Sequence, residues 1–254
     1  MQAISHFLSV TQNANRPILT HYHSFRDEIS GPVAARWVAK MANLLASDLS
    51  PDLFGGDENT PRILINLPAG WQSTFWQVSA NFMGWETRTD TISQDSPSIA
   101  FSFDVHVSDE LVPLEASTAA WRLAHSITPL AMRWRGPLPA GILDALAELM
   151  AQSDQFEYEA LESAPALDNY IAQVEADEDT LFKAASALGM PTRLGLYTEN
   201  FPSAPLLTRL WLAGHSVVIV DKSHYDAQKA QEIFASEKVQ LAVNEELRAP
   251  HARG

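Results

Sequence analysis

A chain of 254 residues with 46% hydrophobic and 19% charged side chains has the composition of a globular protein that can bury a core. Its 31 acidic and 17 basic residues give a net charge of −14, so we expect neither a nucleic-acid nor a membrane partner. The absence of cysteine excludes disulfides, thiolate nucleophiles and cysteine-ligated metals. Without a basic leader or an apolar run of about 18 residues, we expect a cytoplasmic protein.

The first elements are predicted to be a hairpin followed by a helix. Residues 16–23 alternate apolar and polar side chains, which predicts a strand that pairs across a short turn with a segment ending at Ile29. Ser30 suits the N-cap of a helix. Apolar residues then recur at helical spacing over residues 33–48, which predicts an amphipathic helix.

The middle of the chain begins with a strand, a helix, a glycine and a second strand. The predicted elements are a turn-rich break at 50–61, a buried strand at 62–67, a helix at 71–83, strands at 87–92 and 98–103, and helices at 117–125 and 142–152. The segment 104–139 has no clear strand pattern.

An acidic segment follows. There is no lysine or arginine between Arg135 and Lys183, and eleven acids lie from Asp144 to Asp179. Such a run usually forms a solvated face, which is what we expect here, and the alternative is a patch for a cation or a basic partner. Residues 177–179 lack the glycine and the later bidentate glutamate of a calcium-binding EF-hand loop.

The last third alternates helices and strands. The predicted elements are a helix at 179–188 ending at Gly189, a strand at 192–197, a helix at 203–213 ending at Gly214, a strand at 216–221, a helix at 226–236 and a strand at 239–243. Right-handed crossovers would make these strands parallel. We therefore predict an α/β fold of parallel or mixed sheets flanked by helices. We expect these elements to form a single domain of residues 1–254. The alternative is a division into two lobes, 1–135 and 136–254.

Several of these segments resemble the N-terminal region of adenylate-forming enzymes, the superfamily of acyl-CoA synthetases, luciferases and peptide-synthetase adenylation domains. The similar segments are 33–45, 62–68, 75–84, 210–221, 227–234 and 239–243. The chain is most similar to a short uncharacterised bacterial family related to AMP-binding synthetases. The resemblance implies the layered sheets of the N-terminal subdomains, truncated before the C-terminal domain.

The chain departs from this superfamily where the triphosphate would bind. The superfamily uses a Ser/Thr/Gly-rich loop that ends in a Pro-Lys pair, whereas residues 177–191 here form an acidic start on an ordinary amphipathic helix. The chain also ends about where the adenine- and ribose-binding motifs would begin, without the domain that carries the catalytic lysine. We therefore expect a catalytically degenerate protein with no catalytic residues and no cofactor, which does not activate acyl groups with ATP.

A ligand cleft is expected at the carboxyl ends of the last strands, because open α/β sheets bind ligands there. Its candidate residues are Tyr197, Thr198, Glu199, Asn200 and Asp221. The ligand would be a small molecule or a nucleotide, although the loop after Tyr197 has no glycine to admit a pyrophosphate. Asp221 is more simply explained as a cap or turn residue.

Two other hypotheses come from the residues. His21 and His23 share one face of a strand and could form a metal pair, but no third ligand has suitable spacing, so we expect no metal. No G-x-S-x-G motif indicates a serine nucleophile.

The alternative to a ligand-binding protein is a homo-oligomeric or protein-interaction scaffold that uses an apolar or acidic surface.

Overall fold

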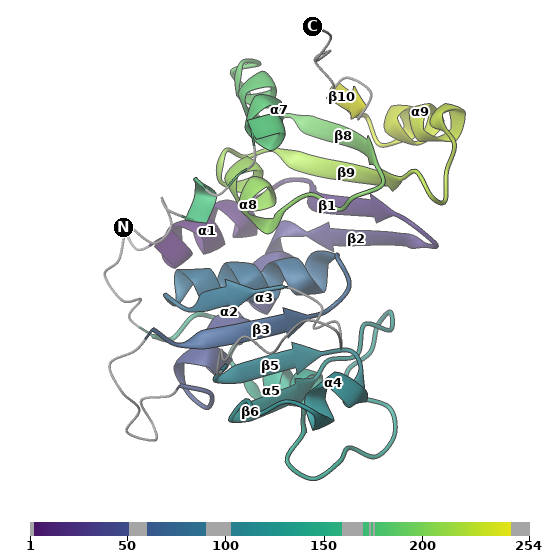
Figure 1. The fold of residues 1–254 in the computed structure, drawn as a ribbon. Helices are drawn as coiled ribbons and strands as arrows, with labels where there is room; N and C mark the ends of the chain where they lie inside the picture. Colours follow the sequence, from purple (N-terminus) through teal and green to yellow (C-terminus); the bar gives the residue numbers. More distant parts are fainter. Residues whose placement is uncertain are drawn as a thin grey trace, which may run out of the picture. The chain divides into compact units, whose positions relative to one another are not determined.

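The computed structural model describes residues 3–50, 60–89, 103–158, 170–172, 174 and 176–244. Two five-stranded sheets organise these residues, and each sheet belongs to its own compact unit (Figure 1). One unit comprises residues 1–5 and 36–167, and the other comprises residues 6–35 and 168–254. The second unit therefore combines the first hairpin of the chain with its last third.

Sheet A, in the second unit, has the strand order β10-β8-β9-β1-β2. Its strands are β1 (Pro17–Tyr22), β2 (Arg26–Ser30), β8 (Arg193–Thr198), β9 (Ser216–Asp221) and β10 (Leu241–Asn244). All neighbours are parallel except β1 and β2, which form the predicted antiparallel hairpin. The first five residues of β9 are buried, as expected for a Val/Ile-rich strand that is covered on both faces.

The helices of sheet A are α7 (Ala176–Ser186), α8 (Ala204–Leu212) and α9 (Ala227–Ser236). The bounds of α8 and α9 lie within one residue of the predicted ones, whereas α7 begins three residues and ends two residues before its predicted bounds. The side chains of Ser203 and Asp226 cap α8 and α9 by accepting backbone N–H groups. Gly214 has a φ of 80°, a conformation that favours glycine, and it lets the chain pass from α8 directly into β9. The predicted helix–glycine–strand junction is confirmed.

A helix that we did not predict, α1 (Ala3–Gln12), precedes β1. Phe7 on this helix is fully buried, and its ring lies 6.3 Å from the ring of Trp211 on α8. Further along, Gly31 begins α2 (Gly31–Ala46) where a Cβ atom would lie 1.9 Å from the carbonyl oxygen of Thr11. Contact with the rest of the unit thus determines the position of α1, which explains why its short sequence gave no clear signal.

Sheet B, in the first unit, is wholly parallel with the strand order β4-β3-β5-β6-β7. Its strands are β3 (Arg62–Asn66), β4 (Glu86–Arg88), β5 (Val105–Ser108), β6 (Trp121–Ala124) and β7 (Leu143–Asp144). Its helices are the greater part of α2, then α3 (Trp71–Phe82), α4 (Leu111–Glu115) and α5 (Ala145–Ala151). The predicted α/β class, with mostly parallel sheets flanked by helices, is confirmed.

One predicted helix is wrong. Residues 117–125 were expected to be helical, but β6 occupies most of this segment. Hydrogen bonding to β5 on one side and β7 on the other, with Leu123 buried, overrides the weak local helical preference. The short helix α4 was not predicted. Residues 51–59 and 90–102 lie outside the described residues, and with them most of the predicted break at 50–61, the end of the strand at 87–92 and most of the strand at 98–103.

In the part of the chain that the structure describes, no helix combines the length and the hydrophobicity that spanning a bilayer requires.

Candidate functional site

The order of strands in sheet A reverses beside β8 and β9. The chain passes from β8 through α8 to its neighbour β9, and then from β9 through α9 back past β8 to β10. Two right-handed crossovers in opposite directions place α8 and α9 on opposite faces of the sheet. The connections that leave β8 and β9 therefore diverge. Such a point, at what we call the carboxyl edge of sheet A, is where ligands bind in open α/β sheets.

Three of the five residues predicted for this cleft lie on the two faces of the sheet, and the other two lie in the loop after β8. Thr198 and Asp221 are register partners at the ends of β8 and β9, so they share one face. Tyr197 lies on the other face, where its hydroxyl donates to the carbonyl oxygen of Tyr225 over 3.0 Å. Glu199 and Asn200 are exposed in the loop that follows. Of the five predicted residues, only Thr198 and Asp221 lie side by side on the same face of sheet A.

Both of these side chains are used in local turns. The Thr198 hydroxyl donates to the carbonyl oxygen of Asn200 over 2.9 Å and accepts the Asn200 N–H over 3.1 Å. Asp221 Oδ1 accepts the N–H and the hydroxyl of Ser223, each over 2.7 Å. Burial raises the pKa of Asp221, but the hydrogen bonds from Ser223 and His224 outweigh it and hold this pKa below its usual value. Asp221 is thus a turn residue, the simpler of the two interpretations of the sequence.

Strand β1 adds two histidines that sequence reasoning did not connect with Asp221. His21 pairs in register with Ile219, so its side chain shares a face with Asp221. The rings of His21 and His23 stack with centroids 4.4 Å apart, and Phe201 meets His21 edge-on at 5.1 Å. The His-x-His alternation was visible in the sequence, but the pairing of β1 with β9 was not.

The electrostatics of this group keep His21 uncharged. Burial lowers its pKa to about 4, and repulsion from His23 and His224 acts in the same direction, while Asp221 opposes them. His21 is therefore a neutral hydrogen-bonding ring at pH 7. Among the described residues, no three histidine or acidic side chains are arranged to hold a metal ion. We call His21, His23, His224, Phe201 and Asp221 the histidine cluster; it brings several aromatic rings and one carboxylate, which is bonded to Ser223, to one face of the sheet.

The N-terminus of α8, which opens onto this edge, already holds an anion of the chain itself. Glu178 on α7 accepts the N–H of Ser203 over 2.9 Å and the Ser203 hydroxyl over 2.5 Å. The Ser203 oxygen in turn accepts the N–H of Leu206 over 3.2 Å. A helix N-terminus attracts phosphate because its free N–H groups and its dipole favour negative charge. Here a carboxylate occupies that position.

Contacts between α7 and α8 hold this carboxylate in place. Asp179 forms ion pairs of 2.6 Å with Arg209 on α8 and with Lys183 one turn along its own helix. The Arg209 guanidinium lies 3.9 Å from the centre of the Phe182 ring. The segment that was predicted to be a helix in place of a phosphate loop is therefore a helix, and its Glu178 and Asp179 bind neighbouring groups of the chain.

At the N-terminus of α9, too, a carboxylate of the chain accepts a backbone N–H group. Asp226 Oδ1 accepts the N–H of Lys229 over 2.7 Å. Together with Asp221 and the exposed Glu199, this places several carboxylates around the ends of β8 and β9. A phosphate group approaching this edge would meet negative charge instead of free N–H groups. Lys222, whose ammonium lies 5.2 Å from the centre of the Tyr197 ring, is a cation of the same edge.

Other acids of the predicted acidic segment also have structural partners. Asp144 caps α5 and accepts the N–H of Trp134 over 2.8 Å. Asp154 pairs with Lys40 at 2.9 Å. Residues 159–169 of the segment lie outside the described residues. The described acids thus serve mainly as caps and ion-pair partners.

Solved structures of low sequence identity share the fold of this chain. No protein-family model matches the chain, and no curated protein sequence matches it. Solved structures do match. The chain is similar to acetoacetyl-CoA synthetase from Streptomyces lividans, with a TM-score of 0.62 and 14% identity over 98% of this chain and 43% of that one.

Two further structures give the same result. An acyl-CoA synthetase from Brucella canis has a TM-score of 0.59 and 15% identity over 96% of this chain and 47% of its own. The amide bond synthetase McbA from Marinactinospora thermotolerans has a TM-score of 0.55 and 14% identity over 94% of this chain and 48% of its own. At such identities the likeness shows the fold. The chain spans about half the length of these adenylate-forming proteins, and the predicted resemblance to their N-terminal domains is confirmed at the level of fold.

Proposed function

We propose that the chain is a catalytically degenerate relative of adenylate-forming enzymes, which does not activate acyl groups with ATP. In this proposal it keeps a small-molecule cleft at the carboxyl edge of sheet A. The observation that carries the proposal is the Glu178 carboxylate bonded to Ser203 at the start of α8. The chain shares the fold of these enzymes, but at the start of α8, where a helix could bind phosphate, it binds its own Glu178 carboxylate.

The cleft would select its ligand by ring stacking and hydrogen bonding. His21 is neutral and stacked on His23, and Phe201 extends the ring surface. Asp221 supplies the negative charge on the same face. These groups suit a flat neutral or cationic molecule, whereas a phosphorylated one would be repelled. A nucleoside would therefore bind better than its phosphates.

Comparison of adenosine with ATP tests this proposal in one thermal-shift series. A ligand at 100 times its dissociation constant stabilises a protein by about 2.7 kcal/mol. We expect adenosine to raise the unfolding temperature at least as much as AMP or ATP does at equal concentration. A larger rise with ATP, which disappears when pyrophosphate competes, would show that the edge accepts phosphate and would contradict the proposal.

An exposed apolar segment of the first unit favours a second candidate function, a homo-oligomeric or protein-interaction module. Leu130 is 99% exposed, and Met132, two positions along the chain, is 62% exposed. Large apolar side chains gathered on a surface often mark an interface. If the module is homo-oligomeric, light scattering across concentrations will show association that Leu130→Ser weakens. A monomer at every concentration would contradict the hypothesis of a homo-oligomer.

A further inference from the structure

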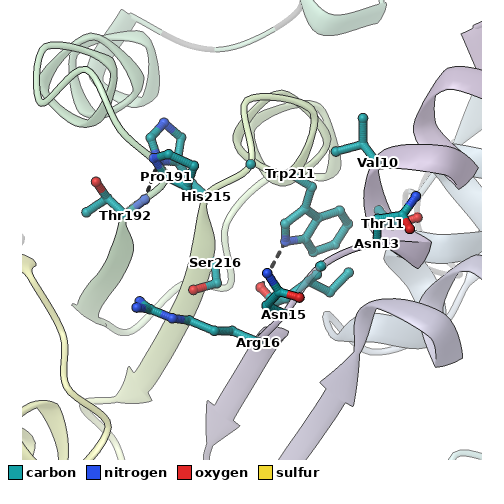
Figure 2. Close-up of a pocket in the computed structure, with 13 residues that line it drawn as sticks. Val10, Thr11, Asn13, Asn15, Arg16, Pro191, Thr192, Trp211, His215 and Ser216 are labelled. Atoms are coloured by element: carbon teal, nitrogen blue, oxygen red, sulfur yellow. Dashed lines mark hydrogen bonds between the residues drawn. The ribbon is translucent and has the colours of Figure 1, made fainter.

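The cavity at the starts of β8 and β9, opposite the carboxyl edge, belongs to the core of the second unit. Its volume is about 400 Å³, and Figure 2 shows the indole of Trp211 among the residues that line it. Trp211 is 1% exposed, and its Nε1 donates to the carbonyl oxygen of Ile18 over 3.0 Å. His215, which also lines the cavity, accepts the Thr192 N–H at Nδ1 over 3.1 Å. These groups serve the packing of the second unit, and a surface suited to a partner lies instead in the first unit.

The segment 116–143 of the first unit has an unusual charge for this chain. It contains three arginines and no lysine or acid, whereas the chain as a whole has a net charge of −14, and residues 144–179 that follow carry eleven acids. The arginines are Arg122, Arg133 and Arg135. Charges act over about 8 Å at physiological salt, so this segment is positive towards a partner that touches it.

In the part of the chain that the structure describes, none of these three guanidinium groups has an ion pair or a hydrogen bond. Five other described arginines pair with acids of the chain, namely Arg26, Arg36, Arg62, Arg193 and Arg209. Arg133 and Arg135 are exposed, and Arg122 is half-buried with its guanidinium beside Gly141. The positive charge of the segment is therefore available to a partner.

Two apolar side chains next to these arginines point into solvent. Leu130 is 99% exposed and Met132 is 62% exposed. Leu130 also has a φ of 58°, in the left-handed region that residues other than glycine and asparagine rarely adopt. A side chain in solvent adds nothing to the core, so the stability of the chain does not explain a leucine at this position. Backbone strain that persists without such a gain is typical of a functional site.

Contacts with sheet B hold the segment in place. The Trp134 N–H donates to Asp144 Oδ2 over 2.8 Å, and Asp144 Oδ1 accepts two further N–H groups at the start of α5, so this acid is already occupied. Trp134 also packs against the buried cluster of Leu114, Ala124 and Ile142. Arg122 shares a face of β6 with Ala124, because residues two positions apart on a strand point to the same side. The arginines and Leu130 therefore belong to one fixed part of the first unit, which lowers the entropy that is lost when a partner binds.

We propose that this surface binds an acidic amphipathic segment of another protein. We call it the arginine–leucine surface, and its residues are Arg122, Leu130, Met132, Arg133 and Arg135. Carboxylates of the partner would pair with the guanidinium groups, and its apolar side chains would cover the leucine and the methionine. The inference rests on the second candidate function, the protein-interaction module, and names its partner.

Charge favours a short acidic segment over two other partners. Two copies of a chain with a net charge of −14 repel one another, and an anionic bilayer would repel the chain over a still larger area. A short segment brings only the few carboxylates that the arginines can pair with. The same unpaired arginines therefore attract it without a large opposing field.

Fluorescence anisotropy with a synthetic peptide tests this surface. The probe is a fluorescein-labelled peptide in which leucine recurs at helical spacing among glutamates. One comparison peptide has serine in place of every leucine, and the other has glutamine in place of every glutamate. We expect saturable binding of the probe, and binding weaker by about tenfold or more for each comparison peptide, because one lacks the apolar contacts and the other lacks the charge.

Leu130→Asn separates binding from folding. Asparagine tolerates a positive φ, so this variant should unfold at the same temperature as the unaltered chain or at a higher one. It should nevertheless bind the probe about tenfold more weakly, since one leucine is lost from the interface. The matched control is Leu188→Ser, which removes a leucine that is 48% exposed in the second unit and should leave the affinity unchanged.

A pair of double variants tests the charge. Arg133→Gln with Arg135→Gln should weaken binding of the probe by about fivefold or more. Arg16→Gln with Arg36→Gln removes the same charge from two exposed positions outside the segment and should bind the probe as the unaltered chain does. Equal binding of the leucine and serine peptides, unchanged affinity of the first double variant, or no saturable binding would each overturn the proposal.

Two further measurements on the chain without peptide identify the other partners. Self-association in light scattering that Leu130→Asn weakens would keep the interaction module but make a second copy its partner, which would overturn the acidic segment. Binding to vesicles of phosphatidylserine and phosphatidylcholine that the same variants abolish would assign the surface to a membrane and would overturn it as well. A monomer that binds neither peptide nor vesicles would contradict both this inference and the second candidate function.

Discussion

Replacement of Glu178 by alanine is the perturbation that most clearly separates a structural carboxylate from an empty phosphate site. The change removes the acceptor of two Ser203 hydrogen bonds, of 2.9 and 2.5 Å. One hydrogen bond to a charged group contributes about 1.5–3 kcal/mol, and the helix dipole adds about 0.3–1 kcal/mol. Water can replace part of this at a half-buried position, and Ser203 still caps Leu206. We therefore expect a loss of about 2 kcal/mol.

Urea unfolding followed by circular dichroism measures this loss, once in chloride and once in phosphate at equal ionic strength. In Glu178→Ala the vacated N-terminus of α8 should accept phosphate and recover about 1 kcal/mol, which corresponds to a phosphate concentration of roughly four times its dissociation constant. The unaltered chain should show no such difference between the salts.

The control is Glu199→Ala, which removes an exposed acid of the same edge. It should change stability by less than about 0.5 kcal/mol and should gain nothing from phosphate. The reasoning would be refuted if phosphate stabilised the unaltered chain as much as Glu178→Ala, or if Glu178→Ala were as stable as the unaltered chain.

Three further predictions concern stability. Burial lowers the pKa of His106 and of His125 to about 4, so their contribution to the free energy of unfolding is complete above about pH 6.5 and is lost as the pH falls towards 4. At about 1.36 kcal/mol per pKa unit each histidine contributes about 3 kcal/mol, so the urea midpoint should fall between pH 7 and pH 4, and an unchanged midpoint would contradict the burial of these rings. Arg193 is 4% exposed and pairs with Glu237 at 2.6 Å, so Arg193→Met should cost about 3–5 kcal/mol in calorimetry, and a cost below 1 kcal/mol would contradict a buried network. Gly214→Ala should cost about 1–2 kcal/mol because its φ is 80°, and an unchanged unfolding temperature would show that the turn can relax.

Local signals in the sequence predicted the last third of the fold. Ser203 and Asp226 have the character of N-caps, and Gly214 ends α8, so helix and strand boundaries there depend on residues a few positions apart. β6 was assigned wrongly because its strand character comes from two neighbours in sheet B, not from its own pattern. Local patterns give no information about such pairings.

The candidate site was predicted only in part for the same reason. The location at the ends of β8 and β9 follows from the alternation of helices and strands, and the turn role of Asp221 was foreseen. The contributions of His21 and Glu178 were not foreseen. Each meets its partners through contacts between segments far apart in the chain, β1 beside β9 and α7 beside α8. A single sequence does not encode these contacts in any visible spacing.

The central claim, that this chain does not activate acids with ATP, is tested most directly by ATP–pyrophosphate exchange with a broad panel of carboxylic acids. The carboxylate held at the start of α8 leads us to expect no exchange above the blank without protein for any acid. Clear exchange that depends on one of the acids would contradict the account, because it would require a triphosphate to bind and react despite Glu178.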